Sequence, residues 1–196
     1  MSHILFMRLA GPMQSWGVMS RFSRRDTGKE PSRSGIIGII CAAMGIDRAD
    51  DGHPDLAKLS QAKLGIRVLR GGVLQSDYHT ASQVAKADGG TKDTELSTRF
   101  YLADADFIAA IQSEDRDLLE RVHAALKRPV WQIFLGRKAF VPSVPVYLKD
   151  EFAIVESDDL AAVLKEAAIT ERLGIPKPHK AFDKDQRVVL EDEAGS

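Results

Sequence analysis

Tyr78 and His79 are adjacent in the stretch DYHTA (residues 77–81), and their side chains are suited to acid–base chemistry. With a nearby lysine, a tyrosine and a histidine could move protons to and from a ribose 2′-hydroxyl and so cleave RNA without a metal. The other histidines are scattered along the chain: His3, His53, His123 and His179. Because Cys, His and Asp show no metal-ligand spacing and no phosphate-binding glycine motif is present, we expect neither a metal nor another cofactor.

A second group of residues could bind phosphate. Five basic side chains fall between residues 21 and 33, namely Arg21, Arg24, Arg25, Lys29 and Arg33. Ser34 and Gly35 then begin an apolar, glycine-spaced segment, and the free N–H groups and dipole at a helix start attract anions. The pattern predicts a cationic, phosphate-binding loop that leads into a buried helix. Acidic residues interrupt the loop, so an ordinary solvated surface is the competing interpretation.

Composition bounds the class of protein. The chain has 196 residues, of which 44% are hydrophobic and 28% charged, with a formal net charge of -1. These values are typical of an ordinary globular protein, in which a polyanion could bind only to a local basic patch. The sequence shows no signal peptide or membrane-spanning run, so we expect a cytoplasmic protein without membrane contact. Cys41 lies in the apolar segment and is interpreted as a core residue.

Hydrophobic patterns predict the elements that must position these residues. Strands are expected at 3–11, 64–72, 104–113 and 130–135, and helices at 34–44 and 115–127. The order strand, helix, strand, strand, helix, strand is that of the ferredoxin-like α+β unit, which RNA-recognition domains share. We expect this domain to span residues 1–150, followed by a short helical and polar extension over 151–196.

The segment 73–103 between the second and third strands is much longer than a hairpin loop and is mostly polar. A structureless loop of this length is unusual in a compact domain. The segment is therefore either a flexible functional arm or a protruding hairpin.

Four blocks of the chain together resemble the CasD family of subunits of the type I-E CRISPR surveillance complex, Cascade. The blocks are RLAGPMQSWG with PSRSGIIGIICAAMGI (8–17 and 31–46), DYHTA (77–81), STRFYLADADF (97–107) and FLGRKAFVPSVPV (134–146). They occur in this order, and each combines several uncommon positions at fixed spacing. Beyond about residue 150 the resemblance is weak.

The resemblance implies a ferredoxin-like, RAMP-type subunit that is not an enzyme. Such a subunit caps a filament of backbone subunits and grips the repeat-derived 5′ handle of the guide RNA (crRNA), with segment 73–103 as a thumb over the guide. The large subunit, and target DNA in the assembled complex, are further partners that it suggests. In the related type I-C system the corresponding subunit cleaves the precursor RNA, and two alternatives stay open: a metal-independent endoribonuclease and a protein assembly module without RNA contact.

The candidate RNA contacts combine the basic residues, the helix start, the thumb and two loop motifs. They are Gln14, Trp16, Arg24, Arg25, Lys29, Arg33, Ser34, Gly35, Tyr78, His79, Arg99, Arg137 and Lys138. For Trp16, base stacking and a structural role as a cover over the core are equally favoured.

Overall fold

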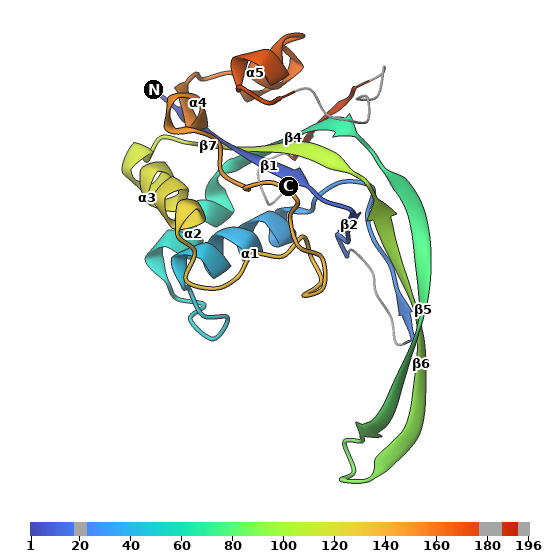
Figure 1. The fold of residues 1–196 in the computed structure, drawn as a ribbon. Helices are drawn as coiled ribbons and strands as arrows, with labels where there is room; N and C mark the ends of the chain where they lie inside the picture. The colour runs from blue at the N-terminus through green and yellow to red at the C-terminus, as the bar shows by residue number, and fades with distance from the viewer. Residues whose placement is uncertain (18–22, 177–185, 192–196) are drawn as a thin grey trace.

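The computed structural model describes residues 1–17, 23–176 and 186–191. Its centre is an antiparallel sheet with the strand order β8-β1-β7-β4-β9 (Figure 1). The strands are β1 (His3–Ala10), β4 (Lys63–Arg70), β7 (Asp106–Ser113), β8 (Ile154–Glu156) and β9 (Val188–Glu191). The order β8-β1-β7-β4 is that of the ferredoxin-like fold, so the predicted fold class is confirmed.

Three helices lie on one face of this sheet (Figure 1). They are α1 (Arg33–Met44), α2 (Pro54–Gln61) and α3 (Arg116–Lys127). Helix α3 starts where Asp115 accepts a hydrogen bond from the N–H of Leu118, and its apolar stripe is buried. Both predicted helices are therefore present within one or two residues of the expected ends.

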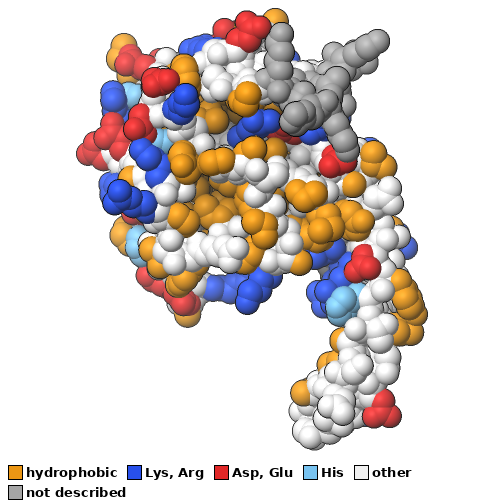
Figure 2. All heavy atoms as spheres, viewed as in Figure 1, with side chains coloured by type: hydrophobic (Ala, Val, Ile, Leu, Met, Phe, Trp, Pro, Cys, Tyr) orange, Lys and Arg blue, Asp and Glu red, His pale blue; other side chains and the backbone are white. Residues whose placement is uncertain are grey.

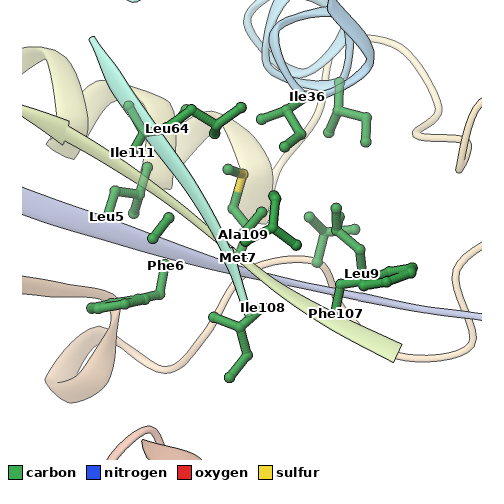
Figure 3. Packing of buried hydrophobic residues seen from close by; sticks show 14 of the residues in the cluster. Leu5, Phe6, Met7, Leu9, Ile36, Leu64, Phe107, Ile108, Ala109 and Ile111 are labelled. Atoms are coloured by element: carbon green, nitrogen blue, oxygen red, sulfur yellow. The ribbon is translucent and has the colours of Figure 1, made fainter. Parts of the chain in front are cut away.

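The strands β1 and β7 are mostly apolar because both of their faces are covered, and their buried charges, Arg8 and Asp106, form an ion pair with each other. Leu5 and Met7 point with Ala109 toward the layer of α1, whereas Phe6 and Ile108 point to the opposite side (Figure 3). A predominantly apolar strand is typical of a sheet that is buried on both faces.

The second face of the sheet is covered by the C-terminal part of the chain (Figure 1). This part contains α4 (Asp150–Ala153), α5 (Leu160–Lys165) and α6 (Ile169–Arg172). Leu164 packs so closely on Gly65 of β4 that a Cβ atom at Gly65 would lie 2.4 Å from Leu164 Cδ1. Arg67 Nη1 donates a hydrogen bond to the carbonyl of Leu164. The face that stays open in RNA-recognition domains is thus closed here.

The predicted fourth strand over 130–135 is wrong. The N–H groups of Val130 and Trp131 instead donate to the carbonyls of Ala43 and Ala42 at the end of α1, which the helix leaves unpaired. The fourth strand of the fold is β8, which pairs with the first residues of β1. No described helix has the length and apolarity that crossing a membrane requires.

Segment 73–103 is a protruding β-hairpin (Figure 1). Of the two structures expected for it, the hairpin is therefore the one that is confirmed. Its strands are β5 (Val73–Ala85) and β6 (Thr91–Ala103). Two short strands, β2 (Met13–Gln14) and β3 (Arg24–Arg25), pair with β6 on the side opposite β5, and β3 runs parallel to it. The base of the hairpin is therefore a small sheet of its own.

Candidate nucleic-acid interface

Three arginines from distant parts of the sequence meet at the base of the hairpin. Arg25 of β3 is the register partner of Arg99 on β6, and Arg137 Nη2 donates a hydrogen bond of 3.1 Å to the backbone carbonyl of Arg25. We call Arg25, Arg99 and Arg137 the arginine cluster. Figure 2 shows lysine and arginine side chains gathered where the hairpin leaves the body.

The arginine cluster carries excess positive charge. Burial and then the positive charges of Arg99 and Arg25 lower the pKa of Arg137, while the carboxylate of Asp77 acts in the opposite direction. Within the described ranges, none of these guanidinium groups forms an ion pair. A polyanion placed here would relieve the repulsion between them.

The loop that carries Arg137 is held in place by close backbone contact. Gly136 has φ +95°, and a Cβ atom there would lie 1.8 Å from the carbonyl oxygen of Ser15. The N–H of Ser15 donates to the carbonyl of Leu135 (3.0 Å). Only glycine fits this approach, which places Arg137 over the ring of Phe140 at 5.5 Å from its centroid. Lys138 follows as an exposed side chain.

The other face of the hairpin base combines an arginine with aromatic rings. The guanidinium carbon of Arg24 lies 4.7 Å from the centroid of the Phe100 ring. A shallow pocket of about 250 Å³ lies beside this pair, lined by Ser23, Arg24, Tyr78, Leu96, Ser97, Thr98 and Phe100. Tyr78 is 67% exposed. An aromatic and guanidinium surface of this kind suits an unstacked base.

Tyr78 and His79 lie on opposite faces of the hairpin, because successive residues of a strand alternate in direction. Tyr78 shares its face with its register partner Thr98, whereas His79 shares the other face with Ser97. The Nδ1 atom of His79 is buried and has no hydrogen-bond partner. The two side chains therefore do not converge on one reacting atom.

At the predicted helix start, the N–H of Gly35 and the side chain of Arg33 already have partners within the chain. Helix α1 is capped by Ser32, whose Oγ accepts from the N–H of Gly35, and Ser34 is exposed in the first turn. Arg33 forms an ion pair with Glu191 and donates to the carbonyls of Ser60 and Ala62. The guanidinium of Arg33 is thus tied into the fold, and the N–H of Gly35 is already used.

Two basic residues of the cationic loop remain, Lys29 and Arg21. Lys29 is exposed, whereas Arg21 lies outside the described residues. Of the two glycines in the first half of α1, Gly35 packs against the ring of Trp16, whereas Gly38 is exposed and a Cβ there would contact nothing.

The structure corrects the assignment of Gln14 and Trp16 as RNA contacts. Trp16 is 1% exposed and donates from Nε1 to Oε1 of Gln14, which is itself fully buried. The amide of Gln14 donates in turn to the carbonyls of Leu9 and Ala105. This network joins the loop after β1 to the core, so the structural interpretation of Trp16 holds.

Sequence reasoning missed Phe100 and Asp77 as parts of the interface. Phe100 stands two residues from Thr98 in a strand, which places both on one face, and this period-2 pattern was the available signal. The contact with Arg24 depends on the parallel pairing of β3 with β6, for which the sequence holds no signal. Among the described residues no cluster of His, Cys, Asp and Glu could hold a metal ion.

Comparison with known proteins assigns this chain to a family. The sequence family described as CRISPR-associated protein (Cas_Cas5) matches residues 4–195. The CRISPR system Cascade subunit CasD of Escherichia coli (strain K12) is 30% identical over an alignment of 165 residues, and the match covers 76% of this chain and 71% of that protein.

Two solved structures are similar at 40% sequence identity. A chain of a CRISPR RNA-guided surveillance complex superposes with a TM-score of 0.64 over 73% of this chain and 61% of its own length. A structure described as a Cas protein superposes with a TM-score of 0.61 over 79% of this chain and 66% of its own length. The present chain thus spans less than two thirds of the length of these solved relatives. The resemblance noted from the sequence is confirmed, and the chain belongs to the Cas5 family of CRISPR-associated proteins.

Proposed function

We propose that this chain is a non-catalytic subunit of a CRISPR surveillance complex and that it binds the 5′ handle of the guide RNA at the base of its hairpin. The observation that carries the proposal is the arginine cluster, in which three guanidinium groups from distant segments converge and form no ion pair in the described chain, although the carboxylate of Asp77 lies near them. Arginine groups held in this way are suited to phosphate oxygens. The match to CasD and the similarity to a chain of a surveillance complex support the same assignment.

The covered sheet explains why the hairpin base is the favoured site. In RNA-recognition domains, bases stack on the open face of the four-stranded sheet. Here α5 and the buried Arg8–Asp106 ion pair occupy that face, so RNA is left with the surface around β3 and β6. The pocket beside Arg24 and Phe100 offers a place for one base, while the arginine cluster on the other face of the hairpin holds the backbone.

The geometry of Tyr78 and His79 supports binding rather than cleavage. General acid–base catalysis needs both groups within hydrogen-bond reach of one phosphodiester. Because the two side chains lie on opposite faces of β5, they cannot both act on the same bond. In the proposed role, Tyr78 contacts RNA beside the pocket and His79 packs against the hairpin.

Binding to an RNA oligonucleotide with the repeat-derived 5′ handle tests this proposal. The double variant Arg25→Gln, Arg99→Gln removes two charges from the arginine cluster and should weaken binding. Each phosphate contact to single-stranded RNA contributes about 0.7 to the slope of log K against log salt. We therefore expect the magnitude of the slope to fall by about 1.4.

The matched control is Arg48→Gln, Arg128→Gln, which removes the same charge from exposed positions away from the hairpin. This control should retain the affinity and the salt slope of the unchanged chain. Equal behaviour of the two double variants would contradict RNA binding at the arginine cluster. If neither variant nor the unchanged chain bound RNA, the protein-only assembly role would be favoured instead.

A further inference from the structure

The outer strand of the hairpin, β5, has one free edge. Strand β6 lies between β5 on one side and β2 and β3 on the other, so in the described chain β5 pairs with β6 alone. The edge runs for 13 residues, from Val73 to Ala85. An edge strand of this length presents a row of unpaired N–H and C=O groups.

The register shows which backbone groups face outward. The N–H of Thr98 on β6 donates to the carbonyl of Ser23, and therefore points toward β3 and away from β5. Residues of an antiparallel pair either exchange both hydrogen bonds or turn both away. Tyr78, the partner of Thr98, consequently directs its N–H and C=O to the free edge. The same holds for every second residue up to the irregularity at Gln83, namely Leu74, Ser76, Thr80 and Ser82.

This edge lacks the features that normally prevent pairing with another chain. Proteins protect free edges with lysine, proline, bulges or very short strands. Over Val73–Ala85 the sequence VLQSDYHTASQVA contains no lysine, arginine or proline, and Asp77 is its one charged residue at neutral pH. The single irregularity, at Gln83, lies near the tip and leaves the stretch from Leu74 to Ser82 regular.

Exposed apolar side chains accompany the free backbone. Leu74 is 60% exposed and Tyr78 67% exposed, and both project to the same face because they are separated by an even number of residues. Leu96, the register partner of Thr80, adds a third exposed apolar group to this face. Figure 2 shows hydrophobic side chains on the outer side of the hairpin and basic ones on the side that faces the body.

We propose that the free edge of β5 binds an extended segment of a neighbouring protein subunit, which adds to the hairpin as a further antiparallel or parallel strand. The backbone row would supply the hydrogen bonds, and an apolar side chain of the partner would cover Leu74, which leaves the Tyr78 side chain to the pocket beside Arg24. RNA is disfavoured as the occupant because β5 contains no lysine or arginine. The arginines lie instead on β3, on β6 and in the loop at Arg137.

The inference rests on the proposed function in that the partner is sought in a surveillance complex. Hydrogen exchange tests the inference in three samples: the chain alone, the chain with handle RNA, and the assembled complex. The complex is purified through a tag on this chain from cells that also express its CRISPR-associated neighbours and a repeat RNA. The amides of Ser76, Tyr78 and Thr80 should exchange roughly tenfold or more slowly in the complex only. The inward amides of Gln75, Asp77 and His79 serve as the internal reference, since they already bond to β6.

Three results would overturn the proposal. They are unchanged exchange at the outward amides in the complex, equal slowing by RNA alone, and slowing in the isolated chain that rises with its concentration. The last result would assign the edge to a second copy of this chain. Hydrogen exchange in the complex tests the β5 proposal, and the RNA affinity of the isolated chain tests the proposed function. Because the two are measured separately, either proposal can fail without affecting the test of the other.

A proline variant tests the same edge by mutation. Ser76→Pro removes an outward N–H without removing a bond to β6, so the chain should melt near its normal temperature and keep its RNA affinity. Its incorporation into the complex should fall about tenfold, whereas Ser76→Ala, which keeps the N–H, should assemble normally. Thr80→Pro with Thr80→Ala repeats the comparison nearer the tip if Ser76→Pro does not fold. Normal incorporation of a folded proline variant would contradict the proposal.

Discussion

Arg33 Nε lies 2.9 Å from Glu191 Oε2, which joins the first turn of α1 to the strand β9. The same guanidinium donates to the carbonyls of Ser60 and Ala62, so one side chain connects three segments. Arg33→Ala should therefore lower the free energy of unfolding by about 1–3 kcal/mol, since it leaves these acceptors without a donor.

The salt slope of RNA binding should not change in the same variant, because Arg33 is already engaged within the fold. Denaturant unfolding and RNA titration at several salt concentrations measure the two effects. Arg33→Lys is the control that keeps the charge. A stable Arg33→Ala chain with a reduced salt slope would instead return Arg33 to the RNA interface.

Gly136→Ala should remove the support of the arginine cluster. The new Cβ would clash with the Ser15 carbonyl, and alanine is strained at φ +95°. We expect a loss of about 1–3 kcal/mol in the free energy of unfolding, together with weaker RNA binding as Arg137 moves. Gly52→Ala, at a position where a Cβ would meet nothing, is the matched control. A Gly136→Ala chain with unchanged stability and affinity would show that this contact does not position Arg137.

His79→Ala should leave maturation of the guide RNA intact. The physical reason is that His79 and Tyr78 lie on opposite faces of β5 and cannot share one phosphodiester. RNA from cells that carry the variant is analysed for uncut precursor, with assembly of the complex measured in parallel. Accumulated precursor together with normal assembly would support the endoribonuclease alternative.

Shortening the hairpin should separate folding from assembly. Ala81 and Glu95 are register partners, so replacing Ser82–Thr94 by Asn-Gly preserves the pairing below the cut. The removed residues contribute nothing to the buried core, and the melting temperature should therefore shift by no more than about 3 °C.

Incorporation of the shortened chain into the complex should nevertheless be poor. The control is a variant in which Ala87–Gly90 is replaced by another turn of the same length, because it changes the sequence of the tip without shortening the hairpin. If the shortened chain unfolded, the hairpin would be part of the core; if it assembled normally, residues 82–94 would have no role in assembly.

Acid should weaken the link between α3 and α4. The hydrogen bond from Lys127 and then that from His123 lower the pKa of Asp150. Because the folded state favours the ionised carboxylate, its stabilising effect is complete above the usual carboxyl pKa of about 4 and is lost as pH falls through the lowered pKa. The difference in unfolding midpoint between the unchanged chain and Asp150→Asn should be constant above about pH 5 and shrink below it. A difference that persisted to about pH 2 would contradict this assignment.

Elements with a local signal were predictable from the sequence. The stripe and cap of α3 and the apolar run of β1 gave these elements their type and position. The strand predicted over 130–135 was wrong because an apolar run can equally well pack against the end of a helix. Here the unpaired carbonyls of Ala42 and Ala43 accept hydrogen bonds from this segment. Strand β8 has three residues, too few for any periodic pattern.

The candidate site was predictable in its residue types and not in its grouping. Arg25, Arg99 and Arg137 were each expected to bind RNA, but only the pairing of β3 with β6 and the backbone contact at Gly136 bring them together. Arg33 was assigned to RNA, and Trp16 equally to RNA or to a cover over the core, because a charge or ring in a loop gives no indication of its partners. Glu191, which pairs with Arg33, lies 158 residues away and meets it only through the fold, whereas Gln14 is a sequence neighbour of Trp16 whose burial the sequence does not indicate.

The C-terminal cover of the sheet has a consequence for synthesis of the chain on the ribosome. Leu164, which closes the face over Gly65, and strand β8, which completes the edge of β1, both emerge after the hairpin and α3 have been made. Until then Phe6 and Ile108 have no partner from the C-terminal segment, and the nascent chain exposes apolar surface that can aggregate. Slow translation beyond residue 150 would prolong this vulnerable interval, and chaperones that shield apolar surface would act chiefly within it.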